Sequence, residues 1–263
     1  MKEIVKRKYS AIALQINESS CCGSGCCGDG KVYSIMNEDY SRLSGYDAEA
    51  DLGLGCGLPT EFAAIREGDV VVDLGSGAGN DCFVARAATG ETGQVIGIDF
   101  SPEMIAKAKK NVSRRGFANV EFHQGDIENI PVESDTADVV ISNCVLNLLP
   151  SKNKVFTEIY RVLKPGGHFC ISDIVLVGEL PRSLREAVEL YVGCIAGAIQ
   201  KNDYLELVDR AGYVAVKIQK EKEIRIPDDI LAQYLHREEM ESFKNNRTAV
   251  VSMTLTGDKP GTD

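Results

Sequence analysis

The pattern of hydrophobic and polar positions predicts alternating strands and helices through the middle of the chain. The β-branched run Val70–Val72 has the character of a buried strand, a glycine-rich turn follows it, and a helical pattern continues to residue 88. Further strands are predicted in the segments 93–101, 120–132, 136–150 and 155–174. In the last of these, a helix and a Lys-Pro-Gly-Gly turn precede the strand. Alternation of this kind implies a parallel, doubly wound α/β sheet.

The remainder of the chain extends this sheet. Residues 201–222 have the pattern of a helix followed by a sixth strand, and residues 247–257 could form an antiparallel strand that closes the same sheet. Between these strands, residues 226–242 are compatible with a helix, and we expect the final residues 257–263 to be disordered. Residues 180–199 are predicted to form a helical excursion that acts as a lid. We therefore expect a mostly parallel, seven-stranded, doubly wound α/β sheet.

Composition narrows the possible partners. The chain has 263 residues, enough to bury a sizeable core, and its 44% hydrophobic and 26% charged residues are ordinary for a globular protein. The formal net charge of −10 argues against a nucleic-acid partner, because phosphate binding needs clustered Lys and Arg. The basic segment 2–9 is compatible with a short helix and not with a signal peptide, since no apolar stretch follows it. No apolar run is long enough to span a bilayer, so we expect a cytoplasmic location.

The turn after the first predicted strand has the features of a nucleoside-binding loop. Residues 73–79 read Asp-Leu-Gly-Ser-Gly-Ala-Gly, and the glycines allow a sharp turn and the close approach of a ligand. The next strand ends in Asp99, where a carboxylate can accept hydrogen bonds from both hydroxyls of a ribose. A dinucleotide fingerprint would need glycine at residue 80, which is Asn80. The turn therefore departs from the pyrophosphate-binding pattern.

The chain has nine cysteines, and four of them lie close together in the segment 18–30 (ESSCCGSGCCGDG). These four are Cys21, Cys22, Cys26 and Cys27. A disulfide staple, a zinc or iron–sulfur site, an inert flexible arm and a handle for another thiol-seeking element all remain open for them. The odd total fits a pure disulfide framework poorly, and the absence of a nearby histidine or a familiar spacing weakens the metal-site alternative.

The other cysteines are spread through the chain, and a buried free cysteine is commonly just a small apolar residue. They are Cys56, Cys82, Cys144, Cys170 and Cys194. We expect Cys170, in the middle of a strand, to be packed in the core. Cys144 follows the fourth predicted strand, Cys56 lies in a glycine-rich loop before the first, and Cys194 lies in the helical excursion. These three thiols could converge at the carboxyl ends of the strands, where ligands of such folds bind.

Several stretches of the sequence resemble a known enzyme family. The spacing Asp-x-Gly-x-Gly-x-Gly in 73–79 resembles motif I of class I (Rossmann-like) methyltransferases, which bind S-adenosylmethionine. The chain as a whole resembles arsenite S-adenosylmethionine methyltransferases, particularly the shorter prokaryotic type. The similar stretches, which cover most of residues 46–215, are LGLGCG, VVDLGSGAGNDCF, VIGIDFSPEMI, NVEFHQGDIENIPV, VVISNCVLNLLP, RVLKPGG, ISDIV, ELP and YVGCIAGA. SNCVLNL and GCIAGA are the most discriminating, because related quinone and sterol methyltransferases lack those cysteines.

The resemblance implies a division of the chain and a cofactor site. It implies a cysteine-rich arm with helices in 1–55, an S-adenosylmethionine-binding Rossmann-like core in 56–175, and lid helices with the closing strands in 176–263. The residues implied to hold the cofactor lie around the glycine-rich turn and at the ends of the following strands: Asp73, Gly75, Ser76, Gly77, Gly79, Asp99, Phe100, Met104, Gly125, Asp126, Ile127 and Asn143.

The resemblance also implies a substrate site for trivalent arsenic. Cys56, Cys144 and Cys194 would be the catalytic thiols and would hold As(III), which is soft and thiophilic. Three sulfur ligands leave one lone pair on arsenic, and the attack of this pair on the methyl group of the cofactor would give methylarsenic and S-adenosylhomocysteine. Because no proton has to leave the acceptor, positioning would dominate the rate enhancement. The substrate would arrive as a thiol adduct of arsenite, with neither nucleic acid nor a membrane as a partner.

Methylation formally takes arsenic from the trivalent to the pentavalent state. A thiol reductant of the thioredoxin or glutathione type is therefore implied as a further partner. The resemblance gives Cys82 and the cluster Cys21, Cys22, Cys26 and Cys27 a role in thiol–disulfide exchange or in arsenic capture.

Two other functions remain open at this point. A carbon methyltransferase for a quinone or another small molecule would share the core and would be indifferent to arsenite. A thiol-based metalloid sensor would bind arsenite without S-adenosylmethionine. The intact cofactor motifs and the lack of a recognisable DNA-binding segment count against the sensor.

Overall fold

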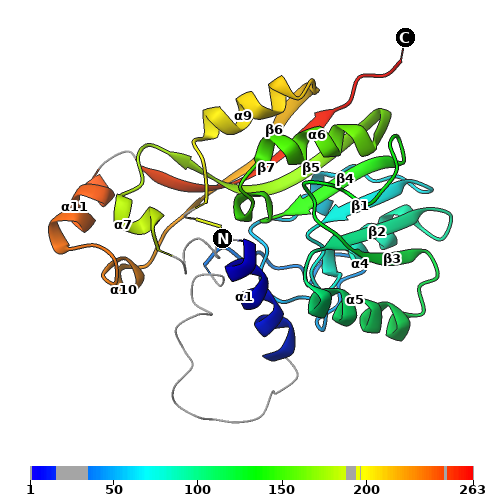
Figure 1. Cartoon of the computed structure of the whole chain (residues 1–263), viewed down its shortest axis with the longest axis horizontal. Helices are drawn as coiled ribbons and strands as arrows, with labels where there is room; N and C mark the ends of the chain where they lie inside the picture. Colours follow the sequence, from blue (N-terminus) through cyan, green and yellow to red (C-terminus); the bar gives the residue numbers. More distant parts are fainter. Residues whose placement is uncertain (1, 16–34, 188–193, 196, 246–247, 263) are drawn as a thin grey trace.

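The computed structural model describes residues 2–15, 35–187, 194–195, 197–245 and 248–262. Its centre is a seven-stranded sheet with the order β3-β2-β1-β4-β5-β7-β6 (Figure 1). Neighbours among the first five strands are parallel, whereas β7 runs antiparallel to both β5 and β6. This confirms the mostly parallel sheet expected from the sequence. The strands are β1 (Val70–Leu74), β2 (Gln94–Asp99), β3 (Val120–Gln124), β4 (Ala137–Asn143), β5 (Leu163–Val177), β6 (Val214–Ile224) and β7 (Ala249–Asp258).

Helices cover both faces of the sheet, as a doubly wound fold requires (Figure 1). Successive side chains of a strand point to opposite faces, and β1 shows this directly. Val71 packs in a core with α4 and α5, and Val72 packs in a core with α6 and α9. The helices described are α1 (Lys2–Gln15), α3 (Pro59–Phe62), α4 (Asn80–Thr89), α5 (Pro102–Arg115), η1 (Leu146–Leu148, a 3₁₀ helix), α6 (Lys152–Val162), α7 (Arg182–Arg185), α9 (Lys201–Arg210), α10 (Asp228–Leu231) and α11 (Arg237–Asn245).

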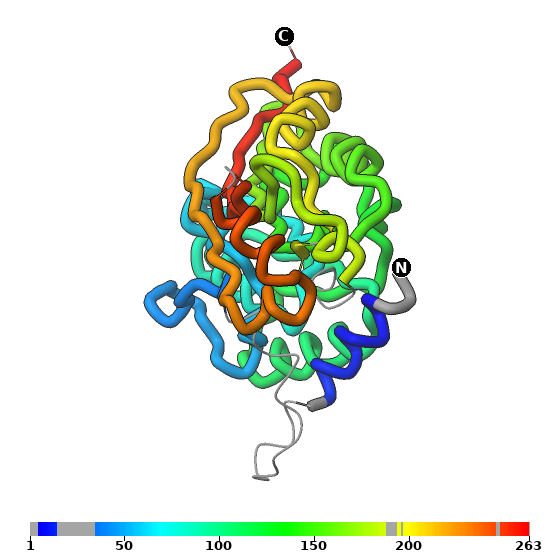
Figure 2. The backbone as a smooth tube through the Cα atoms, turned by 90° about the vertical axis from the view of Figure 1, so that its left-hand side faces the viewer, coloured from blue at the N-terminus to red at the C-terminus, as the bar shows by residue number. Residues whose placement is uncertain are grey.

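The N-terminal helix α1 lies against α5 (Figures 1 and 2). Ser101 caps α5, since its side chain accepts a hydrogen bond from the backbone N–H of Met104. The hydroxyl of Ser10 in α1 donates to the carboxylate of Glu103 and lies 3.2 Å from the hydroxyl of Ser101. Because Ser101 closely follows the end of β2, these contacts place α1 beside the carboxyl ends of the strands.

The structure corrects two expectations about the chain's turns and its end. The Lys-Pro-Gly-Gly stretch is part of β5, at a point where the register against β4 shifts. The prediction of a disordered tail is wrong for the residues described, because β7 continues to Asp258 and Lys259 is held on both sides. Its backbone N–H donates to Gly167 and its carbonyl accepts from Gly166, while its ammonium donates to the carboxylate of Asp135. Pairing with β5 therefore orders the end of the chain.

The structure describes only part of the predicted lid. Within 180–199, the part that the structure describes contains the short helix α7 and then a turn that includes Cys194. Residues 226–242 contain α10 and the first part of α11. The boundary placed after residue 175 lies inside β5, and the last two strands complete the same sheet.

The crevice expected for a ligand lies where β1 pairs with both β2 and β4. In an open α/β sheet, a crevice forms at the carboxyl ends of strands whose connections leave toward opposite faces. β1 leads into α4 on one face, and β4 leads through η1 into α6 on the other. The fold therefore places the glycine-rich turn beside the residues that follow β4.

Candidate active site

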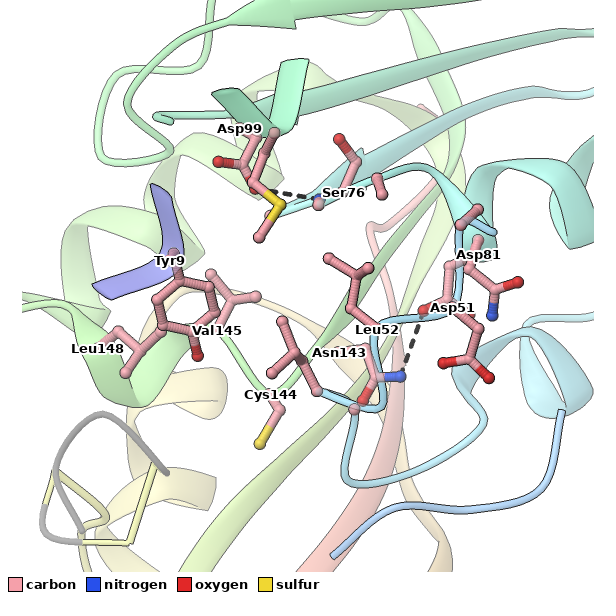
Figure 3. Close-up of a pocket in the computed structure, with 18 of the residues that line it drawn as sticks. Tyr9, Asp51, Leu52, Ser76, Asp81, Asp99, Asn143, Cys144, Val145 and Leu148 are labelled. Atoms are coloured by element: carbon pink, nitrogen blue, oxygen red, sulfur yellow. Dashed lines mark hydrogen bonds between the residues drawn. The ribbon is translucent and has the colours of Figure 1, made fainter. Parts of the chain in front are cut away.

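A solvent-open cavity of about 700 Å³ lies at the carboxyl ends of β1, β2 and β4. Figure 3 shows Ser76 and Asp99 on one side of the cavity and Cys144 on the other, with Tyr9 reaching in from α1. The lining residues that matter below are Tyr9, Tyr40, Asp51, Gly75, Ser76, Gly77, Asp81, Asp99, Phe100, Met104, Asn143, Cys144, Val145 and Leu148.

The glycine-rich turn forms one wall, and its glycines have different tasks. Gly77 has a φ of +52°, and a Cβ built on it would meet no atom within 4 Å, so its backbone faces open space. Gly79 has a φ of +99°, but a Cβ there would lie 2.7 Å from the ring of Phe122. Gly79 does not line the cavity. Gly77 thus offers its backbone to a ligand, whereas Gly79 lets α4 approach the sheet.

Asp99 ends β2 and is almost completely buried at the cavity wall. Burial raises the pKa of this carboxyl from 3.8 to about 6, although the backbone N–H groups of Ser101 and Gly77 donate to it and oppose the rise. These hydrogen bonds measure 2.8 Å from Ser101 and 3.0 Å from Gly77. The carboxylate is therefore held in a fixed orientation at the point where the sequence predicted a ribose contact.

An apolar compartment of about 450 Å³ adjoins the main cavity and shares Asp99 and Phe100 with it. It brings together the segment Gly125–Ile127 after β3, Val145 and Leu148 after β4, and Val5 from α1. The resemblance implied a cofactor contact for Gly125, Asp126 and Ile127, and the structure places all three here. Val5 was not predicted, because nothing near it in the sequence points to the sheet.

The residues of the cavity fit S-adenosylmethionine chemically. The hydroxyl of Ser76 is buried at the cavity wall without a hydrogen-bond partner, and a polar group from a ligand would satisfy it. The carboxylates of Asp81 and Asp99 suit a cofactor with a cationic sulfur and an ammonium group. The apolar compartment around Ile127 suits an adenine ring. The donor set therefore matches the cofactor that the sequence implied.

Asp73 and Cys82 lie behind this wall and do not line the cavity. The thiol of Cys82 donates to the Asp73 carboxylate at 3.2 Å, and both side chains are buried. Burial raises the pKa of Cys82 well above its ordinary value, and the negative charge of Asp73 adds to this effect. Cys82 closely follows the glycine-rich turn in the sequence, but it lies on the inner face of α4 and its side chain packs in the core.

Asn143 links the cavity to the loop that carries Cys56. Its side-chain amide N–H donates to the hydroxyl of Tyr40, to the carbonyl of Gly57 at 2.9 Å and to the carboxylate of Asp81 at 3.2 Å. Its amide oxygen accepts a hydrogen bond of 3.0 Å from the backbone N–H of Cys56. The sequence predicted Asn143 as a cofactor contact, and its place in the cavity wall agrees with that position.

Tyr40 and Asp81 are site residues that the sequence did not predict. The hydroxyl of Tyr40 donates to both carboxylate oxygens of Asp81, at 2.9 and 3.0 Å. Burial raises the pKa of Asp81 to about 6, although the hydrogen bonds from Asn143 and Tyr40 oppose the rise. The sequence could have indicated Asp81 through its position in the first helical turn after the glycine-rich loop. No sequence pattern around Tyr40 indicates a place in the site.

The three thiols expected to converge do meet beside this cavity. Cys56 precedes α3, Cys144 follows β4, and Cys194 lies in the turn between α7 and α9; each is buried and free. The thiol of Cys144 hydrogen bonds with those of both Cys56 and Cys194. The thiol of Cys194 also donates to the backbone carbonyl of Cys144 at 2.8 Å.

Backbone geometry marks two of these cysteines as unusual. Cys144 has a φ of +59° and Cys194 a φ of +64°, a region that residues with a Cβ adopt at a cost. The surrounding structure therefore holds the backbone of both cysteines in a conformation that is intrinsically unfavourable for residues with a Cβ. Such conformations concentrate at functional sites.

Burial favours the protonated form of two of these thiols, Cys56 and Cys144. Burial raises the pKa of Cys56, and it raises that of Cys144 well above the ordinary range, with the hydrogen bonds to Cys194 and Cys56 adding to the effect. Within the described part of the chain, no group of three or more histidine, cysteine, aspartate or glutamate side chains is arranged to hold a metal ion. A ligand that exchanges with neutral thiols suits this cluster better than a divalent cation, which needs thiolates.

The remaining predicted residues fall in different places. Met104 is fully buried and lines the cavity, so it contributes to the wall as well as to the core. Cys170 is packed in the core, as expected, with its thiol donating to the carbonyl of Pro59. The cluster Cys21, Cys22, Cys26 and Cys27 lies outside the described residues. In the described part of the chain, no helix has the length and apolar character that a bilayer crossing requires.

Comparison with known proteins gives a consistent set of relatives. Residues 65–212 match a family model described as a methyltransferase domain. The chain is 39% identical to an arsenite methyltransferase of Halobacterium salinarum, over 100% of this chain and 67% of that protein. It is 35% identical to an arsenite methyltransferase of Aquipseudomonas alcaligenes, over 89% of this chain and 68% of that protein.

A solved structure and a second group of relatives complete the comparison. The crystal structure of an arsenic(III) S-adenosylmethionine methyltransferase from Chlamydomonas reinhardtii superposes with a TM-score of 0.65 at 35% identity, covering 77% of this chain and 66% of that one. A demethylmenaquinone methyltransferase of Lactococcus lactis is 32% identical over 72% of this chain and 83% of that protein. The similarity thus extends to quinone methyltransferases, at lower identity and over less of this chain.

Proposed function

The chain belongs to the arsenite methyltransferase family, and on this premise we propose that it transfers a methyl group from S-adenosylmethionine to trivalent arsenic held by Cys56, Cys144 and Cys194. The products are a methylated arsenical and S-adenosylhomocysteine. The chain spans about two thirds of the length of these two relatives. The proposal therefore concerns the part of them that this chain matches.

One relationship carries the proposal: Cys144 belongs to both sites. It lines the cofactor cavity, and its thiol hydrogen bonds with Cys56 and Cys194. Arsenic bound by that thiol would lie at the cavity wall, where proximity to the cofactor can replace other forms of catalysis. A carbon methyltransferase has no need for three converging thiols at this position.

The cavity residues divide the work of holding the cofactor. When bound, S-adenosylmethionine supplies an activated methyl group on a cationic sulfur. The carboxylate of Asp99 would accept the ribose hydroxyls, and the compartment around Phe100 and Ile127 would hold the adenine. Gly77 allows close approach of the backbone, and Asp81 provides negative charge near the cationic part of the cofactor. Together these groups orient the cofactor and exclude water from one side of it.

Neutral thiols suit arsenite as a substrate. In arsenous acid, each hydroxyl can leave as water after it takes the proton of a thiol, while the thiol sulfur forms a bond to arsenic. No thiolate has to exist beforehand, so the raised pKa values of Cys56 and Cys144 do not oppose the exchange. Divalent metal ions have no such proton acceptor and must displace the protons at a cost. The buried cluster therefore favours arsenite over zinc.

The reduction of the arsenic product belongs to the same proposal. A thiol reductant of the thioredoxin or glutathione type would supply the electrons, in keeping with a cytoplasmic location. The cluster Cys21, Cys22, Cys26 and Cys27 would collect arsenic or relay thiol–disulfide exchange. Cys82 is a less accessible redox partner, because it is buried against Asp73.

The test compares two acceptors. The enzyme is incubated with labelled S-adenosylmethionine and excess thiol, with either arsenite or a demethylated prenylated quinone, and the labelled products are separated. We expect label in methylarsenic species and none in the quinone. Label in the quinone alone would replace the proposal with the carbon methyltransferase alternative. Arsenite binding without label in any product would favour the sensor.

A further inference from the structure

A buried lysine lies close to the thiol cluster. Lys152 is the first residue of α6, yet its side chain is only 8% exposed. The N-terminus of a helix does not stabilise an ammonium group, because that end of the helix dipole is positive. Removing the charge from water is costly unless partners compensate. The burial of Lys152 therefore requires groups in the fold that stabilise its charge.

The partners of Lys152 are a backbone carbonyl and a buried carboxylate. Its ammonium donates a hydrogen bond of 3.1 Å to the carbonyl of Gly197. The charge of Asp173 acts on Lys152 and favours its protonated form against burial. Asp173 itself is 1% exposed and accepts hydrogen bonds from the side chain of Asn147 at 2.9 Å and the hydroxyl of Tyr204 at 3.3 Å. The ammonium is therefore held by Gly197, and Asn147 and Tyr204 hold the carboxylate whose charge acts on it.

Gly197 belongs to the same turn as Cys194. The turn closes with a hydrogen bond from the backbone N–H of Ala198 to the carbonyl of Ile195. Cys194 has its strained φ in this turn and donates its thiol hydrogen bond to Cys144. Further along, the carbonyl of Ile199 accepts a hydrogen bond from Leu176 in β5. Lys152 thus holds the turn between the point where it meets Cys144 and the point where it meets the sheet.

We propose that Lys152 is a positioning residue for arsenic binding: through its hydrogen bond to Gly197 it holds Cys194 against Cys144 and so completes the three-thiol site. The inference rests on the proposed function, because it concerns the same thiols. The charge of Asp173 favours the protonated form of this ammonium and so opposes the effect of burial. Without Lys152, Cys56 and Cys144 would remain in place, since Asn143 holds the backbone N–H of Cys56 and the carbonyl of Ser172 holds that of Cys144.

The first experiment measures arsenite binding directly. Lys152→Met keeps the length of the side chain and removes the donor, and Lys154→Met on the exposed side of the same helix is the matched control. All variants carry serine at the four N-terminal cysteines. We expect arsenite affinity, measured by equilibrium dialysis, to fall about tenfold or more in Lys152→Met. Lys154→Met should retain it, and the affinity for S-adenosylmethionine should stay constant in both.

A double-mutant cycle shows whether Lys152 acts through Cys194. If it does, adding Lys152→Met to Cys194→Ser should weaken arsenite binding no further, because the group it positions is already gone. Additive losses, or unchanged binding in Lys152→Met, would overturn the inference. If the wild-type protein binds no arsenite in this background, the proposed function fails and the inference fails with it.

Hydrogen exchange on the wild-type protein keeps the inference testable if Lys152→Met does not fold. Arsenite should slow amide exchange in the turn 197–199 and in the first turn of α6 together. Slower exchange in the turn with no change at α6 would contradict a role for Lys152.

Discussion

The amide oxygen of Asn143 accepts a hydrogen bond from the backbone N–H of Cys56 at 3.0 Å, across 87 residues of sequence. The other end of the same amide reaches Asp81 in the cofactor cavity. Asn143 precedes Cys144 directly. A single side chain thus fixes the loop of one thiol, adjoins a second thiol and forms part of the cofactor wall.

The first prediction concerns this link. Asn143→Ala removes the hydrogen bonds that the side-chain amide donates and leaves the N–H of Cys56 without its partner, so the free energy of unfolding should fall by about 1–3 kcal/mol. The rate of arsenite methylation should fall about tenfold or more, because Cys56 is no longer oriented. Denaturant unfolding and initial rates measure the two effects, with the exposed Asn153→Ala as control. Methylation at the wild-type rate in Asn143→Ala would show that the link is dispensable.

The second prediction concerns pH. Burial raises the pKa of Asp99 and of Asp81 from 3.8 to about 6. If the cationic cofactor binds the ionised carboxyls, its affinity should rise with pH through about 6 and level off above about 7. Asp99→Asn should bind more weakly and lose part of this pH dependence. Calorimetric titrations across this range provide the measurement, and an affinity independent of pH would contradict the assignment.

The same two carboxyls make the stability of the ligand-free protein depend on pH. Between about pH 4 and 6 the folded state holds more protons than the unfolded state, because its carboxyl pKa values are higher. The contribution of Asp81 and Asp99 to stability should therefore decline as pH rises through this window. Thermal unfolding of the wild type and of Asp81→Asn, measured across this pH range, gives the contribution of Asp81 to the pH dependence of stability. An equal pH dependence in both proteins would mean that Asp81 has no raised pKa.

The third prediction concerns Cys144. Cys144→Ser should lower arsenite methylation by about a hundredfold or more, because the ligand shared by both sites is lost. Binding of S-adenosylmethionine should persist, since the residues expected to contact it remain. Cys170→Ser, a core thiol outside the cavity, controls for loss of a buried cysteine. Retained methylation in Cys144→Ser would refute the ligand assignment.

The fourth prediction concerns α1 as part of the cofactor site. Val5 is 1% exposed and lines the apolar compartment. Val5→Ser should weaken S-adenosylmethionine binding about tenfold, because apolar contact with the cofactor is lost. Leu14→Ser on the same helix, where the side chain is 62% exposed, should bind like the wild type. Equal affinities of the two variants for S-adenosylmethionine would show that α1 does not contribute to cofactor binding.

The parts of the account that the sequence could predict depend on local patterns. The β-branched run Val70–Val72 predicted β1, the alternation along the chain predicted β2 and β4, and the glycine spacing predicted the turn that contains Gly77. The acidic end of β2 predicted Asp99. These features are local because the strand, the turn and the strand end each follow from a few neighbouring residues.

The parts that the sequence could not predict depend on contacts between distant segments. Tyr40 meets Asn143 across 103 residues, and Lys152 meets Gly197 across 45. Cys82 follows the turn closely, yet the helical period of α4 points it toward the core. Convergence of Cys56, Cys144 and Cys194 was expected by resemblance. Their hydrogen bonds, and the strained backbone of Cys144 and Cys194, could be seen only in the folded structure.

The most direct test of the central claim is X-ray absorption spectroscopy at the arsenic edge. Arsenite is bound to a protein in which Cys21, Cys22, Cys26 and Cys27 are serine, so that only the core thiols can ligate it. We predict an arsenic atom with three sulfur neighbours and no oxygen, and the loss of one sulfur in Cys194→Ser. Arsenic that keeps its oxygen neighbours, or keeps three sulfurs without Cys194, would contradict the three-thiol site.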